Sequence, residues 1–294
     1  MRQPIFDNLK NSFKRGNIFI QLIYINVGVF LLMALVNVSF LLFNRSSHAI
    51  FSWFELPASF TNFLNQPWSL FTYMFMHAGI LHLLFNMLWL YWFGSIFLQF
   101  FSSKHLRGLY IFGGICGGLL YMLAFNVFPY FKPVVDSSVM VGASASILAI
   151  VVAVAYRAPD YRINLLLFGQ VRLKYLAIGV VILDLVFLTP GNVVDPELSN
   201  RLASNAGGHI AHLGGVLSGL WFAASLSKGA DLTSWINKLL DGIVSLFNKN
   251  TWKKKPKKAK MKVNHSRNME YDYNCRLSTS DASDEGDIVD LGAS

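Results

Sequence analysis

The sequence predicts an all-α, polytopic membrane protein built as a bundle of six transmembrane helices. Hydrophobic residues make up 54% of the 294-residue chain and charged residues only 14%, whereas about a quarter of a soluble domain is charged. The apolar residues also come in long blocks, and about 20 such residues span the hydrocarbon core as a helix. Backbone groups in lipid must be satisfied internally, so each block is expected to be helical.

We identify six apolar blocks, and each is expected to form one span of a membrane domain over residues 17–227. The blocks are 18–43, 78–100, 106–128, 141–157, 174–189 and 208–226. A basic segment, residues 1–16, precedes the first block. That block is too long for a signal peptide and is followed by no small-residue cleavage pattern, so we expect it to be retained as a span.

The placement of basic residues predicts the orientation of the bundle. Short loops rich in Lys and Arg stay in the cytoplasm. The N-terminal segment, the loop with Lys104 and Arg107, and the loop from Arg157 to Lys174 are basic. The alternate loops, 44–66, 129–139 and 190–206, are poor in basic residues or mixed in charge. This pattern predicts an even number of spans with the N- and C-termini both cytoplasmic.

The segment after the spans has two parts. Within residues 228–250, apolar residues recur at helical spacing over 232–247. This amphipathic helix is expected either to lie flat at the cytoplasmic interface or to pack on the inner face of the bundle. Residues 251–294 are first basic, with a Lys-rich run over 253–262, and then acidic, and are expected to be disordered. The basic run predicts binding to anionic membrane lipids, and not to nucleic acid, because no nucleic-acid-binding module accompanies it.

Polar side chains inside spans are costly and usually mark function. A serine hydroxyl is a weak nucleophile until a base takes its proton, and histidine is the usual base. Ser144 and His212 lie in different blocks, and small residues flank both. Gly215 and Gly219 form a GxxxG pair that allows two helices to approach closely. The pattern therefore predicts a hydroxyl and an imidazole on two helices that touch.

An acyl-transfer site also needs hydrogen-bond donors for the developing oxyanion. His82 and Asn86 are four residues apart, so they share one helix face. The backbone N–H of Ser144, at the start of its block, is a further donor. In the predicted topology these donors, Ser144 and His212 all lie toward the outer side of the membrane, and this agreement in depth favours a single site.

At these residues the chain resembles the rhomboid family of intramembrane serine proteases, of the bacterial type. The resemblance covers about residues 17–226 and is carried by three segments, 77–86, 142–145 and 211–215. It implies that Ser144 and His212 form a catalytic dyad with no aspartate. It implies an oxyanion hole made by His82, Asn86 and the Ser144 N–H. Gly142 would permit the tight backbone there, and His77 would hydrogen-bond nearby loops.

The resemblance further implies that the substrates are transmembrane segments, cut near the outer face, with small residues before the cut. It also implies a location in the inner (plasma) membrane of a cell, without a cofactor or a metal ion. Two positions depart from the family pattern, where Gly and an aromatic residue are common: Ala145 and Leu148. Both can preserve packing, although Leu148 cannot stack on the His212 ring.

Other interpretations of these residues remain open. An inactive relative would only bind membrane segments. A metal site or metal transporter could use the chain's buried ionisable residues, but no H-E-x-x-H pattern occurs and no polar route reaches the cytoplasm. Ser146 is expected to pack and His209 to bond a loop. Asp184 is expected to have a structural or water-facing role, or else to tune the site. In the metal interpretation, the ligands would come from His77, His82, Asp184, His209 and His212.

Overall fold

The computed structural model describes residues 17–165, 169–188 and 196–247, and a long helix lies at each of the six apolar blocks. Within these ranges, four stretches are long and apolar enough to cross a membrane: α2, α6, α7 and residues 206–227 of α10. The predicted class, a helical membrane protein, is confirmed, and the count of six spans stays a prediction. The helices are α2 (Ile18–Leu42), α6 (Ile80–Phe100), α7 (Ser103–Val127), α8 (Ser144–Arg157), α9 (Leu173–Leu188) and α10 (Pro196–Ser227).

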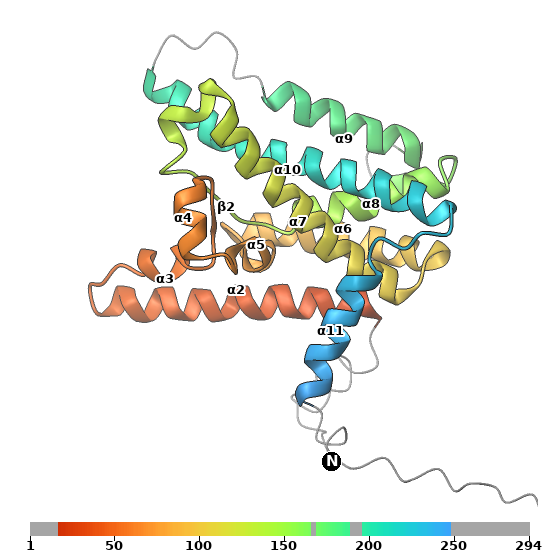
Figure 1. The fold of residues 1–294 in the computed structure, drawn as a ribbon, viewed down its shortest axis with the longest axis horizontal. Coiled ribbons are helices and arrows are strands. Elements are labelled where there is room, and N and C mark those ends of the chain that lie inside the picture. The colour runs from red at the N-terminus through yellow and green to blue at the C-terminus, as the bar shows by residue number, and fades with distance from the viewer. Residues whose placement is uncertain (1–16, 166–168, 189–195, 248–294) are drawn as a thin grey trace, which may run out of the picture. The chain divides into compact units, whose positions relative to one another are not determined.

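Helix α8 is the central element, with α6, α7, α9 and α10 packed around it (Figure 1). Every residue from Ala145 to Ala155 is buried. Its 14 residues give a helix of about 21 Å, which is shorter than the hydrocarbon core of about 30 Å. Arg157, a basic residue, is the last residue of α8, and in the predicted orientation it lies at the cytoplasmic end. Ser144, at the opposite end, is therefore expected to lie below the outer surface of the membrane.

Small residues allow α8 and α10 to touch along their backbones. A Cβ added to Gly215 would overlap the carbonyl of Ala145, and one added to Gly219 would overlap that of Ala149. The two contacts are one helical turn apart on both helices, so α8 and α10 meet along a continuous seam. This seam sets how closely His212, one turn before Gly215, approaches the start of α8.

Short elements between α2 and α6 support the segment that leads into α8. They are α3 (His48–Ser52), β1 (Leu56–Pro57), α4 (Phe60–Asn65), α5 (Ser69–Thr72) and the 3-10 helix η1 (Tyr73–Phe75). Strand β1 pairs antiparallel with β2 (Val139–Met140), Leu56 opposite Met140. The N–H of Gly142 donates to the Tyr73 carbonyl at 3.0 Å. These bonds fix the chain immediately before Ser144.

Three segments that the sequence interpretation treated as loops contain regular structure. The 3-10 helix η2 (Pro129–Val134) follows α7, and a hairpin of β3 (Arg162–Leu165) and β4 (Gly169–Arg172) joins α8 to α9. Helix α10 begins at Pro196, well before the predicted start at 208. Proline is compatible with a first helical position because its missing N–H would be unpaired there. The apolar block 208–226 corresponds only to the part of α10 that is apolar enough to cross a membrane.

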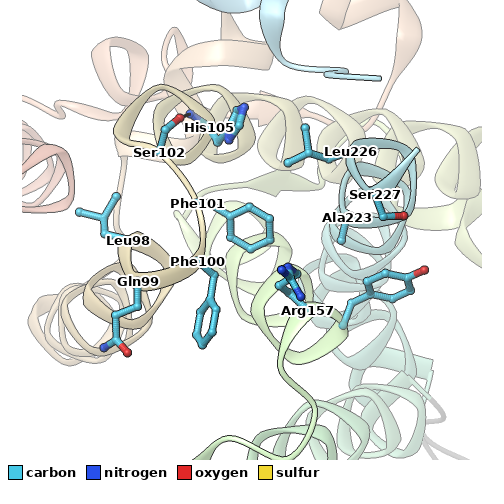
Figure 2. A pocket seen from close by; sticks show the side chains of 11 residues that line it. Leu98, Gln99, Phe100, Phe101, Ser102, His105, Arg157, Ala223, Leu226 and Ser227 are labelled. Atoms are coloured by element: carbon cyan, nitrogen blue, oxygen red, sulfur yellow. Dashed lines mark hydrogen bonds between the residues drawn. The ribbon is translucent and has the colours of Figure 1, made fainter. Parts of the chain in front are cut away.

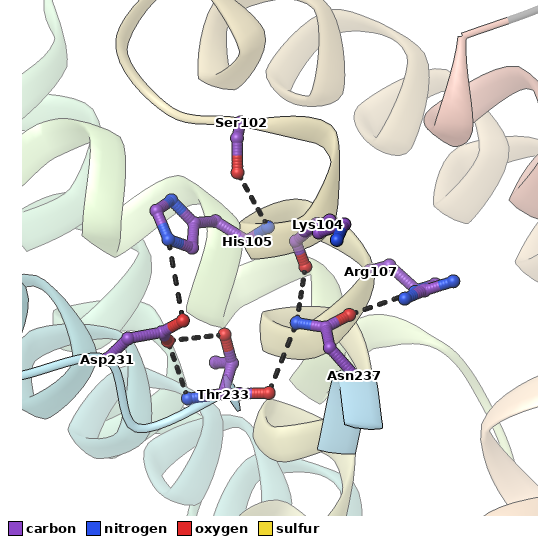
Figure 3. Close-up of polar contacts among 7 residues, drawn as sticks. All are labelled: Ser102, Lys104, His105, Arg107, Asp231, Thr233 and Asn237. Carbon is purple, nitrogen blue, oxygen red and sulfur yellow. Dashed lines mark hydrogen bonds and ion pairs between the residues drawn. The ribbon is translucent and has the colours of Figure 1, made fainter. Parts of the chain in front are cut away.

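Helix α11 (Ser234–Phe247) packs its first turns on the start of α7. Buried Asn237 donates to the Lys104 carbonyl at 3.0 Å and accepts from Arg107 Nε at 3.0 Å. Figure 3 shows both bonds. Asp231 accepts from the N–H of Thr233 at 2.8 Å. Packing on the bundle, one of the two predicted modes, thus holds for these turns. The exposed apolar residues further along are compatible with an interfacial position: Leu239, Ile243, Val244 and Leu246.

Candidate active site

Four residues expected at the site, His82, Asn86, Ser144 and His212, line one cavity of about 360 Å³. They come from α6, α8 and α10, which are far apart in the sequence. The remaining wall is largely apolar, with Asp184 and His209 as its further ionisable residues. The other lining residues are Phe85, Trp89, Ile147, Leu148, Val180, Leu183 and Phe187.

A larger cavity, of about 770 Å³, lies where α8 and α10 end and α7 begins (Figure 2). It also contains serines and a histidine. However, Ser102 caps α7 by accepting the His105 N–H at 3.2 Å, and Ser227 donates to the Ala224 carbonyl at 2.7 Å. Both hydroxyls are engaged with the backbone. The cavity around Ser144 therefore remains the candidate for acyl transfer.

Ser144 is the first residue of α8, and its side chain is half-buried. At such a position the backbone N–H has no partner within the helix and is free to donate. Gly142, two residues earlier, has a φ of 129°, a conformation that favours glycine. A Cβ there would lie 2.9 Å from His82 Nε2 and 3.7 Å from Ser144 Oγ. The absence of a side chain at Gly142 thus lets the His82 ring approach the serine.

His82 and Asn86, the two side chains of α6 that are expected to donate to the oxyanion, make different hydrogen bonds in this structure. The Ala78 N–H donates to His82 Nδ1 at 3.4 Å. Because Nδ1 accepts, the proton of the neutral ring is on Nε2, the nitrogen that faces Gly142. Asn86 donates one N–H to the His82 carbonyl at 2.8 Å. Its amide carries a second N–H, so both side chains retain a donor for a ligand.

Asp184, on α9, connects the site to a second histidine. Its Oδ1 accepts from His212 Nδ1 and from His209 Nδ1, both at 2.8 Å. Asp184 is only 5% exposed. The structure thus places a carboxylate beside His212, and it joins His209 to α9 through Nδ1. The catalytic dyad and a further bond from His209 to a loop stay predictions. In the predicted topology, Asp184 and His212 both lie in the outer half of the membrane. This common depth is the one feature of the sequence that could have predicted their contact.

His77 lies beside His82 but outside the candidate cavity. Its ring lies 5.3 Å from the His82 ring, edge to face, yet it lines a separate cavity of about 190 Å³. Neither ring nitrogen has a hydrogen-bond partner among the described residues. Burial, with a smaller contribution from the nearby His82, lowers the pKa of His77 to about 4. The ring is neutral at pH 7, and a hydrogen bond from His77 to nearby loops stays a prediction.

Three of the five residues in the metal interpretation come together. The ligand atoms of Asp184, His209 and His212 lie within 4.8 Å of one another, and these residues could hold a metal ion. The two hydrogen bonds at 2.8 Å account for the same arrangement without one. His77 and His82 are not part of this group. Among the described residues, the metal interpretation is therefore limited to one cluster, formed by Asp184 on α9 and the two histidines on α10.

The fold and this largely apolar cavity define a helical membrane protein in which a serine and three histidines from three helices line one cavity. The family model described as the Rhomboid domain matches residues 64–229, more than half of the chain, and the chain belongs to the rhomboid family. The resemblance that the three motifs indicated is thereby confirmed.

Two relatives show how far this similarity extends. The chain is 25% identical over 171 residues to Presenilin-associated rhomboid-like protein A, mitochondrial, of Danio rerio, covering 56% of this chain and 38% of that protein. It is 26% identical over 222 residues to RHOMBOID-like protein 12, mitochondrial, of Arabidopsis thaliana, covering 72% and 59%. The chain thus spans less than two thirds of either relative. Both names say mitochondrial, so the bacterial type and the plasma membrane stay predictions.

Proposed function

We propose that this protein is an intramembrane serine endopeptidase that cleaves transmembrane segments through an acyl-enzyme. The observation that carries the proposal is the convergence of His82, Asn86, Ser144 and His212 on one cavity within the helical bundle. Small-residue contacts between α8 and α10 support close approach of the serine and the imidazole. Membership of the rhomboid family supports the same reaction class.

In this mechanism His212 Nε2 takes the proton of Ser144 as Oγ attacks the peptide carbonyl. His212 then returns the proton to the leaving amine, and the peptide C–N bond breaks. Water, activated by His212, hydrolyses the resulting ester and restores the hydroxyl. The oxyanion formed in each half-reaction would accept hydrogen bonds from His82 Nε2, Asn86 Nδ2 and the Ser144 N–H. Such donors act strongly in a site that excludes bulk water.

The walls of the cavity support a substrate taken from the lipid. Phe85 on α6 and Leu183 and Phe187 on α9 line it, with exposed fractions of 58%, 54% and 62%. In a membrane these side chains face hydrocarbon, so the wall between α6 and α9 adjoins the lipid. A transmembrane segment cut near the outer face, with small residues before the bond, suits this position. We also propose cytoplasmic termini, and a Lys-rich tail, outside the described residues, that binds anionic lipid.

Labelling with a fluorophosphonate tests the proposal directly, because such reagents trap activated serine nucleophiles. In the detergent-purified full chain, we expect the label on Ser144 by peptide mass analysis and cleavage of a fluorescent single-span substrate. Ser146→Ala is the matched control, since Ser146 is a buried serine on the same helix that does not line the cavity. Its hydroxyl faces α7, where a Cβ added to Gly114 would lie 2.8 Å from Ser146 Oγ. We expect it to label and cleave normally. Substrate binding without label or cleavage would favour the inactive, binding-only alternative.

Asn86→Ala is expected to lower kcat partially, by roughly 10²- to 10³-fold, because one oxyanion donor among three is removed. KM should change little, since the ground-state carbonyl carries little charge. Steady-state cleavage of the same substrate measures both constants. A kcat equal to that of the unaltered protein would exclude Asn86 from the oxyanion hole.

A further inference from the structure

The proposed base, His212, has a carboxylate on its other nitrogen. Asp184 Oδ1 lies 2.8 Å from His212 Nδ1, within the range of a strong charge-assisted hydrogen bond. A carboxylate has no proton to donate at neutral pH, so Nδ1 is the donor. The neutral ring then carries its proton on Nδ1, and Nε2 is left as a lone pair. That is the tautomer in which Nε2 can accept the proton of Ser144.

Helix α9 holds this carboxylate in a restricted position. Asp184 is buried, and its Oδ1 also accepts from His209 Nδ1 at 2.8 Å. His209 in turn stacks on Phe187, with ring centroids 5.7 Å apart. Asp184 Oδ2 has no hydrogen-bond partner among the described residues. The hydrogen bonds that those residues offer to this carboxylate therefore come from the two histidines of α10.

We propose that Asp184 is a positioning residue that fixes the tautomer and ring orientation of His212, so that the site works as an aspartate–histidine–serine relay assembled from α9, α10 and α8. This inference rests on the proposed function. The proton still moves only between Ser144, His212 and the leaving group, and Asp184 stays ionised while it stabilises the imidazolium that forms. His209 acts as a second anchor for the carboxylate.

A purely structural role is the competing explanation, in which the carboxylate only ties α9 to α10. The two roles differ in what they affect. Loss of a tie would lower the unfolding midpoint and alter substrate binding. Loss of a positioning group would lower the chemical rate of a protein that still folds and binds.

Asp184→Asn separates these roles, with Asp160→Asn as the matched control. Asp160 undergoes the same chemical change, but it is exposed and pairs with Lys174 on the surface, where an ion pair contributes little. For Asp184→Asn we expect kcat to fall by up to about 10⁴-fold, the loss that the same change causes in a serine-protease triad, because the amide NH₂ can donate to Nδ1 and favours the wrong tautomer of the histidine. KM and the unfolding midpoint should stay within about twofold and a few degrees, respectively. Asp160→Asn should match the unaltered protein.

A second measurement does not depend on activity. In the full chain labelled with ¹⁵N-histidine, the ring nitrogen shifts report which nitrogen carries the proton, and His212→Ala assigns the signal. We expect the proton on Nδ1 of His212, and we expect this preference to be lost in Asp184→Asn. If that variant does not fold, the tautomer in the unaltered protein decides the question.

Each result has one meaning. Unchanged kcat in Asp184→Asn, with Ser144→Ala inactive, would overturn the positioning role and leave the proposed function intact. A proton on Nε2 of His212, or stoichiometric zinc bound in place of the Nδ1 proton, would also overturn it. Cleavage that persists in Ser144→Ala would instead defeat the proposed function, and the Asp184–His212 bond would then be a structural contact.

Discussion

Ser144→Ala and His212→Ala should each reduce substrate cleavage by at least about 10⁴-fold, which is background in most assays. The estimate follows serine proteases in which loss of the nucleophile or the base removes nearly all catalysis. Because the two residues act in one step, the double variant should be no slower than either single variant. End-point cleavage of a fluorescent single-span substrate, with long incubation, measures all three.

Ser144→Ala should remain folded, since it only shortens a half-buried side chain beside a cavity. His212→Ala also removes a hydrogen bond to Asp184, but the carboxylate keeps His209 Nδ1 as a donor, so we expect this variant to fold as well. Equal unfolding midpoints and equal substrate binding are the controls. Cleavage by Ser144→Ala at more than a hundredth of the normal rate would contradict a serine mechanism. Cleavage at the normal rate by His212→Ala alone would leave the nucleophile in place and require another base.

Gly215→Ala is expected to lower activity about 100-fold, because a displacement near 1 Å at a site can cost that much. Its Cβ would overlap the Ala145 carbonyl, which is backbone and cannot rotate away. Helices α8 and α10 would have to separate beside the cavity that Ser144 and His212 line. Overpacking of this kind also costs about 1–3 kcal/mol of stability. Cleavage rates and thermal unfolding in detergent measure the two effects.

Gly208→Ala is the matched control on the same helix, because no heavy atom of the described residues lies within 4 Å of a Cβ at that position. It adds the same methyl group and removes the same backbone freedom. We expect normal cleavage and a midpoint that is unchanged or slightly raised. Similar losses in both variants would show that α10 tolerates no alanine, and the contact with Ala145 would then not be the cause.

The sequence by itself determined the class of protein, the helical blocks and the residues of the candidate site. These properties can be predicted because they depend only on the order of residues along the chain. The length of an apolar block gives its ability to span lipid, and a polar residue within it stands out by its cost. Spacing along one helix also fixes a face, which is why His82 and Asn86 could be paired before the structure.

Only the tertiary structure decided which side chains of different helices face each other. It placed Asp184 on His212 and His209, left His77 without a hydrogen-bond partner among the described residues, and set Gly142 against His82. Depth in the membrane limits the candidates for each contact, but the rotation and crossing of helices select among them. Those angles arise from side-chain packing along whole helices, such as the seam at Gly215 and Gly219, and not from any local pattern.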